Sequence, residues 1–207
     1  MIRLPLLCTL LLLAAAAPAG AMVRLPEFPR PVEGNPAARL LSVPLEDSYY
    51  DGARKCTPKA SRPGMLALQR WLEANARGVF WGSYRCEKWS KCQASLHSEN
   101  RAIDWHLDVF DRADKRAAEK LIRLLLAPDV AGNTQALARR MGVEELIWDC
   151  GYWGAGMTQF EKYQPCYGKR GKLKRKVNKT IAHRDHVHIG MTRRGAAART
   201  SFWSRGR

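Results

Sequence analysis

Three features of the sequence predict an α+β fold made of a single domain. Residues 102–109 alternate between apolar and polar side chains, which is the pattern of a strand with one buried face. Residues 63–77 and 111–127 each carry apolar side chains at helical spacing. The chain has 207 residues, a length typical of one domain with an ordinary core, and it shows no internal repeat.

Residues 1–21 have the pattern of a secretory signal peptide. A basic start, M-I-R, is followed by a run rich in Leu and Ala and by the small residues Ala19-Gly20-Ala21. We therefore expect cleavage near Ala21 and a protein that is secreted, periplasmic or held in the cell-wall space. No other run approaches the roughly 18 apolar residues that a membrane-spanning helix needs, so we expect no transmembrane segment in the mature chain.

The mature chain starts with an irregular segment. Residues 22–63 are rich in Pro, Gly and isolated charges without a sustained period, and we expect them to wrap around the domain that follows, 64–192. In that domain a helix is expected over residues 63–77, before Gly78. Residues 79–85 form the first strand, because aromatic and β-branched residues are dense there.

The second half of the domain begins with a capped helix. Asp111 is placed to cap a helix that runs to about Ala127. A shorter helix is expected over residues 134–141, and Gly142 separates it from a strand over residues 143–148.

Residues 151–164 have the composition of a loop rich in Gly and aromatic residues. The aromatic side chains of this loop either wall a cleft or pack against the domain: Tyr152, Trp153, Phe160 and Tyr163. Residues 168–171 form the turn of a basic hairpin, and residues 181–191 carry the last histidines. The basic C-terminal tail, residues 193–207, is expected to be mobile.

Five cysteines remain after removal of the signal peptide, and an exported chain favours disulfides over thiolate metal sites. Cys150 and Cys166 flank the aromatic loop and are expected to bridge it. Cys56 and Cys86 would tie the N-terminal segment to the first strand. A bond between Cys86 and Cys92 is the alternative, because connectivity does not follow from sequence.

The formal net charge is +16, and much of it lies near the C-terminus. Residues 168–207 contain thirteen Lys or Arg residues and one acid, Asp185. Such a surface attracts polyanions, and for an exported protein we expect peptidoglycan or another anionic cell-wall polymer in preference to nucleic acid. The expected contact residues are Lys169, Lys172, Lys174, Arg175 and Lys176. The alternative is a solvated basic surface that only aids solubility.

All five histidines lie in two short clusters. His97 precedes Asp104 by seven positions, across a polar turn in which Asn100 can take the left-handed conformation that swings His97 back toward the strand. Downstream, His186 and His188 point the same way at strand spacing. Two His and one Asp on neighbouring strands make a three-ligand site with an open fourth position, which is the arrangement of a catalytic zinc.

The pattern S-x-H-x-x-N-R-A-x-D, followed downstream by H-x-H, resembles the signature of the zinc D-alanyl-D-alanine carboxypeptidases and lysostaphin-like wall peptidases, whose fold is shared with the hedgehog signalling domain. The first motif of that family is S-x-H-x-x-G-x-A-x-D, and the matching positions are Ser95, His97, Ala102 and Asp104. The chain departs at Asn100, where the family has Gly, and Asn is among the residues most enriched at positive φ. The resemblance implies an antiparallel sheet with flanking helices in a single domain.

The same resemblance implies one zinc ion per chain. Its ligands would be His97, Asp104 and His188, and His186 would lie beside the metal-bound water. The residues G-S-Y-R that end at Arg85 resemble the S-G-Y-R strand of the carboxypeptidases with the first two residues exchanged. Arg85 is therefore the candidate for a substrate-facing cation.

Three further residues are expected to support these ligands. Ser95 belongs to the first motif, and His106, on the same strand face as the aspartate ligand, is expected to donate a hydrogen bond beside the metal. Asp185 could fix the tautomer of a neighbouring imidazole. In a regular strand, however, His183 and Asp185 point away from His186.

The signal peptide predicts export, and the resemblance implies a zinc-dependent peptidase that hydrolyses D-amino-acid-containing peptides of the cell wall, as a carboxypeptidase or an endopeptidase. Some relatives use a glutamate as base, but no Glu follows Glu161, so His186 is the expected base. The alternative is a catalytically degenerate, zinc-stabilised module that binds an anionic wall polymer. A nuclease is the least favoured function, because the sequence lacks the acidic cluster of two-metal phosphoryl chemistry.

Overall fold

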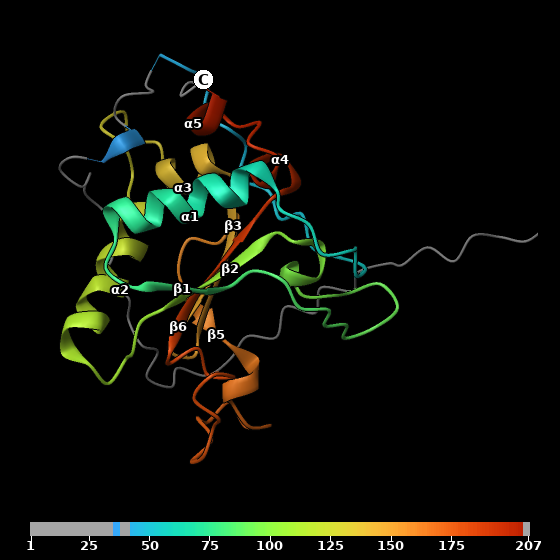
Figure 1. Cartoon of the computed structure of the whole chain (residues 1–207). Helices are drawn as coiled ribbons and strands as arrows, with labels where there is room; N and C mark the ends of the chain where they lie inside the picture. Colours follow the sequence, from blue (N-terminus) through green and yellow to red (C-terminus); the bar gives the residue numbers. More distant parts are fainter. Residues whose placement is uncertain (1–34, 38–41, 205–207) are drawn as a thin grey trace, which may run out of the picture.

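The computed structural model describes residues 35–37 and 42–204. The predicted signal peptide, residues 1–21, and residues 205–207 of the predicted tail lie outside the described residues. The described chain forms a six-stranded sheet in the order β1-β2-β6-β3-β4-β5, with helices packed against it (Figure 1). All neighbouring strands are antiparallel, so the predicted α+β class with an antiparallel sheet is confirmed.

The sheet places the histidine-bearing strand at its centre. β6 lies between β2 and β3, with Asp104 of β2 opposite His188 of β6. The strands are β1 (Val79–Gly82), β2 (Ala102–His106), β3 (Val143–Trp148), β4 (Gly151–Gly154), β5 (Glu161–Lys162) and β6 (His186–Met191). β3 has the predicted bounds, whereas β1 ends three residues before the predicted end.

The helices fall into two groups by length. The longer ones are α1 (Pro63–Asn75), α2 (Arg112–Leu126) and α3 (Ala136–Met141). The shorter ones are the 3₁₀ helices η2 (Leu96–Glu99) and η3 (Gln164–Cys166), and the C-terminal helices α4 (Arg193–Ala196) and α5 (Ser201–Ser204).

The core lies between one face of the sheet and the longer helices. Ile103 and Trp105 of β2 point to this face, as do Val187 and Ile189 of β6, and all four are nearly fully buried. The helical side chains that pack with them include Leu68, Leu72, Leu121, Ile122 and Leu125. Because side chains alternate along a strand, the polar residues of β2 and β6 lie on the opposite face.

Local sequence explains where the helices begin and end. Oδ1 of Asp111 accepts hydrogen bonds from the backbone nitrogens of Ala113 and Asp114, both at 2.8 Å, so Asp111 caps α2 as predicted. Gly142 ends α3 in the left-handed conformation, with φ of 78°. A Cβ at Gly142 would lie 2.7 Å from Cα of Gly195, so a glycine also lets α4 approach α3 closely.

Residues 151–164 do not form the predicted loop. β4 pairs with β3 and β5 pairs with β4, so the sheet continues through this segment. Trp153 and Phe160 are buried in the core, while Tyr152 and Tyr163 are partly exposed. The glycines suggest a loop, but the aromatic side chains supply the apolar surface that an outer strand needs.

The C-terminal segment, predicted to be a mobile tail, packs against the domain over its described part. Oγ1 of Thr192 caps α4 by accepting a hydrogen bond from the backbone nitrogen of Gly195 at 3.0 Å. Nε1 of Trp203 donates to the carbonyl oxygen of Met141 at 2.8 Å. The many basic residues suggested a mobile tail, but small residues between them, such as Ala196, are buried against the domain.

The N-terminal segment lies against the turn that precedes β2. Residues 42–62 contain no helix or strand. The backbone nitrogen of Thr57 donates to the carbonyl oxygen of Ser98 at 2.8 Å, and that of Ala60 donates to Oδ1 of Asn100 at 2.9 Å. These hydrogen bonds fix η2 and the residue that ends it to the N-terminal segment.

Both expected disulfides, Cys56–Cys86 and Cys150–Cys166, are present. The first of them excludes the alternative bond between Cys86 and Cys92. Disulfides are typical of proteins outside the reducing cytosol. Over residues 35–37 and 42–204, none of the helices has the length and apolar character needed to cross a membrane.

Candidate metal centre

The backbone brings His97, Asp104 and His188 together. Asp104 and His188 are direct partners in the sheet register. His97 lies in η2, which ends at Asn100 in the left-handed conformation (φ 55°, ψ 43°), as predicted, so the chain turns back into β2. η2 can pack closely on the sheet because residue 190 of β6 is a glycine. A Cβ at Gly190 would lie 2.2 Å from the leucine side chain of η2.

The candidate ligand atoms form a compact triangle. Nε2 of His97 lies 3.0 Å from Oδ1 of Asp104 and 3.0 Å from Nδ1 of His188, and the latter two atoms are 3.3 Å apart. Ligands bound at about 2.0–2.1 Å around a tetrahedral zinc stand about 3.3 Å from one another. The three residues therefore form a group that could hold a metal ion of this size and leave one position open.

The contacts around the triangle point lone pairs into it. Nδ1 of His97 lies 2.9 Å from the carbonyl oxygen of Ser83, which can only accept, so Nε2 of His97 is left with its lone pair. Nε2 of His188 lies 3.0 Å from Oε1 of Glu145, away from the ideal hydrogen-bond angle, and a proton there leaves the lone pair on Nδ1. Two nitrogen lone pairs and a carboxylate oxygen then meet in a buried site, where a cation stabilises them.

In the metal-free protein a proton can partly replace the cation in stabilising these groups. Burial lowers the pKa of His97. Burial also acts to lower the pKa of His188, but the nearby carboxylates of Asp104 and Glu145 outweigh it and raise that pKa to about 9. Burial acts to raise the pKa of Asp104, yet its close contacts with the imidazoles of His188 and His97 hold that pKa well below its usual range. The site thus favours positive charge, and metal binding to such groups displaces protons.

His186 presents a nitrogen without a hydrogen-bond partner to this centre. Its Nδ1 lies 2.8 Å from Oδ1 of Asp185, whose other oxygen accepts a hydrogen bond from Oγ1 of Thr180 at 2.6 Å. Its Nε2 is buried, has no hydrogen-bond partner among the described residues, and lies 3.4 Å from Oδ1 of Asp104. Burial lowers the pKa of His186, which favours the neutral imidazole. This geometry suits a base oriented by a carboxylate.

His183 also lies at the centre, against the expectation for a regular strand. Its ring centroid is 4.6 Å from that of His186 and 5.8 Å from that of His188. β6 starts only at residue 186, and His183 belongs to a turn in which its own φ is 51°. Burial lowers the pKa of His183 well below its ordinary value. The ring of Tyr163 packs edge-on against His183, with centroids 5.0 Å apart.

The same turn explains the position of Asp185. Strand alternation predicts that its side chain points away from His186, but the residue precedes β6 and its carboxylate folds back onto that imidazole. Asn178 is the residue from which this turn could have been predicted, because Asn favours turns. Its Oδ1 accepts from the backbone nitrogens of Thr180 and Ile181, at 2.9 and 3.0 Å.

Ser95 and His106 lie next to the centre without joining it. Oγ of Ser95 accepts a hydrogen bond from the backbone nitrogen of His97 at 3.4 Å and so caps η2. Nδ1 of His106 lies 2.6 Å from the carbonyl oxygen of Asp185. The ring of His106 stacks on Trp81 with centroids 4.7 Å apart.

Arg85 contacts the aspartate of the triangle. Its Nη1 lies 2.5 Å from Oδ2 of Asp104, and its Nε lies 3.0 Å from Oε2 of Glu87. The side chain is 42% exposed, so it faces both the candidate ligand and the solvent. Asp104 therefore uses one oxygen for the histidines and the other for Arg85.

Glu145 and Tyr50 are further residues of the site that motif analysis missed. Glu145 of β3 is paired in register with Gly190, which puts its carboxylate beside His188. The hydroxyl of Tyr50 donates to Oε2 of Glu145 at 2.7 Å. Carboxylates in this position orient metal-bound imidazoles. Nothing in the local sequence marks Glu145, because only the register of β3 and β6 brings it to the site.

The predicted polyanion-binding residues lie together on an exposed hairpin that projects from one end of the sheet (Figure 1). The backbone nitrogen of Gly168 donates to the carbonyl oxygen of Lys172 at 2.9 Å, which closes the predicted turn. All five predicted contact residues are exposed: Lys169, Lys172, Lys174, Arg175 and Lys176.

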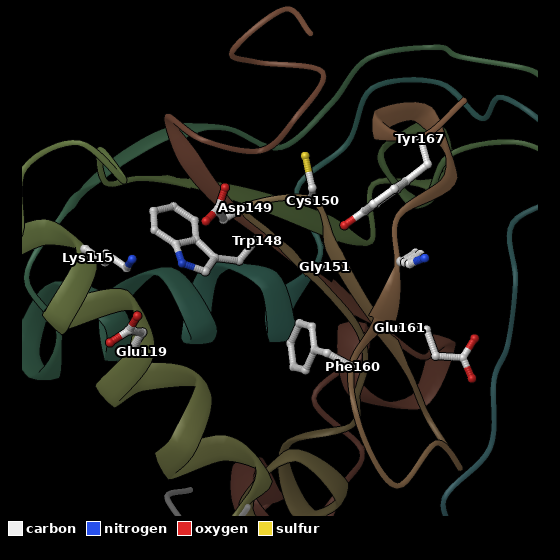
Figure 2. A pocket seen from close by; sticks show the side chains of 10 residues that line it. Lys115, Glu119, Trp148, Asp149, Cys150, Gly151, Phe160, Glu161 and Tyr167 are labelled. Carbon is white, nitrogen blue, oxygen red and sulfur yellow. The ribbon is translucent and has the colours of Figure 1, made fainter. Parts of the chain in front are cut away.

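A small surface cavity lies between α2 and the β3–β5 end of the sheet. Figure 2 shows Lys115 and Glu119 of α2 on one side of it and Trp148 and Phe160 on the other. No histidine lines this cavity. It is therefore separate from the metal centre.

Comparison of the chain with protein-family models, with curated proteins and with solved structures gave no significant match. The functional assignment therefore depends on the geometry of the centre and on the sequence motifs.

Proposed function

We propose that this chain is an exported zinc-dependent peptidase that hydrolyses D-amino-acid-containing peptides of the cell wall. The observation that carries the proposal is the triangle of His97 Nε2, Asp104 Oδ1 and His188 Nδ1. Beside it, Nε2 of His186 lies 3.4 Å from the aspartate oxygen and has no hydrogen-bond partner in the described part of the chain. Three ligands with an open position form the usual catalytic zinc site. One zinc ion per chain is expected.

The chain's own residues supply the proton transfers. A bound zinc would polarise the scissile carbonyl and activate a water molecule. Nε2 of His186 would take the proton of the attacking water, and Asp185 would stabilise the resulting imidazolium through Nδ1. The imidazolium would then give this proton to the leaving amine as the peptide C–N bond breaks, which restores the neutral His186. Oδ2 of Asp104 stays paired with Arg85, which fixes the plane of the ligand carboxylate.

Arg85 is proposed to recognise a substrate carboxylate as well. Nearly half of its side chain is exposed at the rim of the centre. A guanidinium has five donors in a planar fork, so two protein carboxylates do not exhaust it. This role would favour substrates with a free carboxylate near the scissile bond.

Three observations support a substrate in the cell wall: the motif resemblance, the disulfides and the basic hairpin. Two disulfides suit a protein that works outside the reducing cytosol. The exposed hairpin is suited to retain the protein on peptidoglycan or on another anionic wall polymer.

A second function, a zinc-stabilised binding module, is favoured by the burial of the centre. Only 0%, 7% and 2% of the surfaces of His97, Asp104 and His188 are exposed. Structural zinc sites are closed, whereas catalytic sites keep a position open to water and substrate. In this alternative the basic hairpin would provide the binding and no bond would be cut.

Digestion of purified peptidoglycan separates the two functions. The zinc-loaded protein and its His186→Ala variant, at equal zinc content, would be incubated with the polymer and the soluble products analysed by mass spectrometry. Released D-alanine would identify a carboxypeptidase, and shortened cross-linked peptides an endopeptidase. Wild-type protein that sediments with the wall and releases no product would establish the binding module.

A further inference from the structure

Trp81 offers an exposed aromatic surface at the edge of the metal centre. Its indole stacks on the ring of His106, with centroids 4.7 Å apart and planes inclined by 28°, and its centroid lies 5.8 Å from that of His186. Although Trp81 packs on these rings, 52% of its surface is exposed. A large aromatic ring held by a neighbour and open to solvent is a typical contact surface for a ligand.

The two acidic residues that flank His106 along this face of the chain each form an ion pair. Asp104 and Asp108 stand two positions before and after His106, and beyond the end of β2 the backbone nitrogens of Leu107 and Val109 still donate to the carbonyl oxygens of Asp185 and Arg184, at 3.3 and 2.8 Å. The flanking pairs are Arg85 with Asp104 at 2.5 Å, Arg85 with Glu87 at 3.0 Å and Lys179 with Asp108 at 2.7 Å.

These pairs define the chemistry of a ligand that Trp81 could hold. Both flanking cations already contact carboxylates, so the rim offers donors and acceptors without a surplus of positive charge for a polyanion. A purely apolar ligand would cover these groups and leave them without partners, which is costly. A pyranose ring has an apolar C–H face for the indole and a rim of hydroxyl groups for the ion pairs. It therefore fits both features.

We propose that Trp81 is the platform of a binding site for a hexopyranose ring. The identification of that ring as a sugar of the glycan strand rests on the proposed function, since wall peptides are attached to such strands. His186 lies beside Trp81, so a peptide linked to the bound sugar would reach the metal centre. The protein would then prefer peptides that are still attached to glycan.

Titration with a tetramer of N-acetylglucosamine tests the site without requiring cleavage. Calorimetry would compare zinc-loaded wild type with Trp81→Ala, Trp81→Tyr and Trp89→Ala. Trp89 is the matched control, because it is another exposed tryptophan (66%) in a segment outside the strands. Zinc content and circular dichroism would establish that each variant is folded.

We expect Trp81→Ala to weaken tetramer binding by roughly tenfold or more, the size of a lost aromatic stacking contact. Trp81→Tyr should recover much of the affinity, and Trp89→Ala should bind as wild type does. Wild type that does not bind the tetramer, or folded Trp81→Ala that binds it equally well, would overturn the proposal.

A kinetic comparison distinguishes this inference from the proposed function. A stem peptide carrying its disaccharide should have a lower KM than the same peptide without sugar, and Trp81→Ala should remove that difference. If neither peptide is cut, the peptidase proposal fails, and the titration still decides the sugar site. Equal KM values in wild type, with both peptides cut, would contradict the sugar site alone.

Discussion

Nε2 of His97 lies 3.0 Å from Nδ1 of His188, although 91 positions separate the two residues in the chain. The Nδ1–H of His97 is directed to a carbonyl oxygen, so its Nε2 cannot donate across this gap while the ring is neutral. Nearby Asp104 adds a carboxylate oxygen at the same spacing from His97. A buried arrangement of this kind requires either a proton or a metal ion, and the triangle has the dimensions of a zinc site.

The first prediction is stoichiometric zinc that depends on the three triangle residues. His97→Ala, Asp104→Ala and His188→Ala should each abolish retention of one zinc per chain, because two ligands do not hold the ion tightly. His106→Ala should retain zinc, since His106 contacts Trp81 and the backbone of Asp185. Elemental analysis after dialysis provides the measurement. Wild type that takes up no divalent metal on titration would show that the centre is not a metal site.

How much of this centre could be predicted depends on the range of the interactions involved. The turn at Asn100 and the alternation along residues 102–109 are local, and the sequence alone placed His97 beside Asp104. The H-x-H spacing likewise predicted His186 and His188 on one face of a strand. These predictions needed only neighbouring residues and regular strand geometry.

The missed features depend on register and on irregular backbone. Glu145 reaches His188 because β3 pairs with β6 in one particular register, and no short motif encodes that register. His183 reaches the centre because a turn replaces the first part of the expected strand. The paired strands β4 and β5 were missed because Gly-rich, aromatic sequence is compatible with both loops and outer strands.

The second prediction separates catalysis from metal binding through His186. His186→Ala should lower turnover by about 10² to 10⁴-fold, as loss of a general base does, while zinc content stays near wild type because the triangle is intact. Arg85→Ala should instead raise KM at least as much as it lowers turnover. The assay is release of D-alanine or cleaved stem peptides from peptidoglycan at matched zinc content. Unchanged turnover in His186→Ala would exclude it as the base.

The third prediction concerns the carboxylate that supports His188. Glu145→Gln should weaken zinc binding by about 10- to 100-fold, because a neutral amide orients and polarises the imidazole less well. Tyr50→Phe removes only the outer hydrogen bond to Glu145 and should have a smaller effect. Competition with a chelator of known affinity measures both. Equal zinc affinity in Glu145→Gln and wild type would show that Glu145 has only a packing role.

The fourth prediction concerns the basic hairpin. If its five Lys and Arg residues bind an anionic wall polymer, retention on peptidoglycan should fall steeply with salt, because exposed charges are screened over about 10 Å at 0.1 M. Neutralising Lys169, Lys172, Lys174, Arg175 and Lys176 together should lower retention and its salt dependence. Cleavage of a small soluble peptide should be unaffected. Retention that does not change with salt would contradict this role.

The fifth prediction concerns the stability of the fold, through the fully buried Arg101. Its Nη1 lies 2.6 Å from Oε1 of Glu144, and its Nε lies 3.1 Å from Oε2 of Glu99. Arg101→Met should lower the free energy of unfolding by about 3–5 kcal/mol, because it leaves the carboxylate of Glu144 buried without its cation. The double variant Arg101→Met/Glu144→Gln should recover part of the loss. Denaturant unfolding monitored by circular dichroism measures both.

The loss caused by Arg101→Met should also depend on pH. Burial raises the pKa of Glu144 to about 7 in the native protein, even though Arg101 acts to lower it, so removing Arg101 raises that pKa further. When the pKa of a carboxyl group is higher in the folded than in the unfolded protein, the free energy of unfolding falls as the pH rises from the unfolded pKa through the folded one. The free energy of unfolding of Arg101→Met should therefore be closer to that of wild type at pH 5 than at pH 8. The double variant should lack this trend, because glutamine does not titrate, and a loss equal at both pH values would show that Glu144 is not the group responsible.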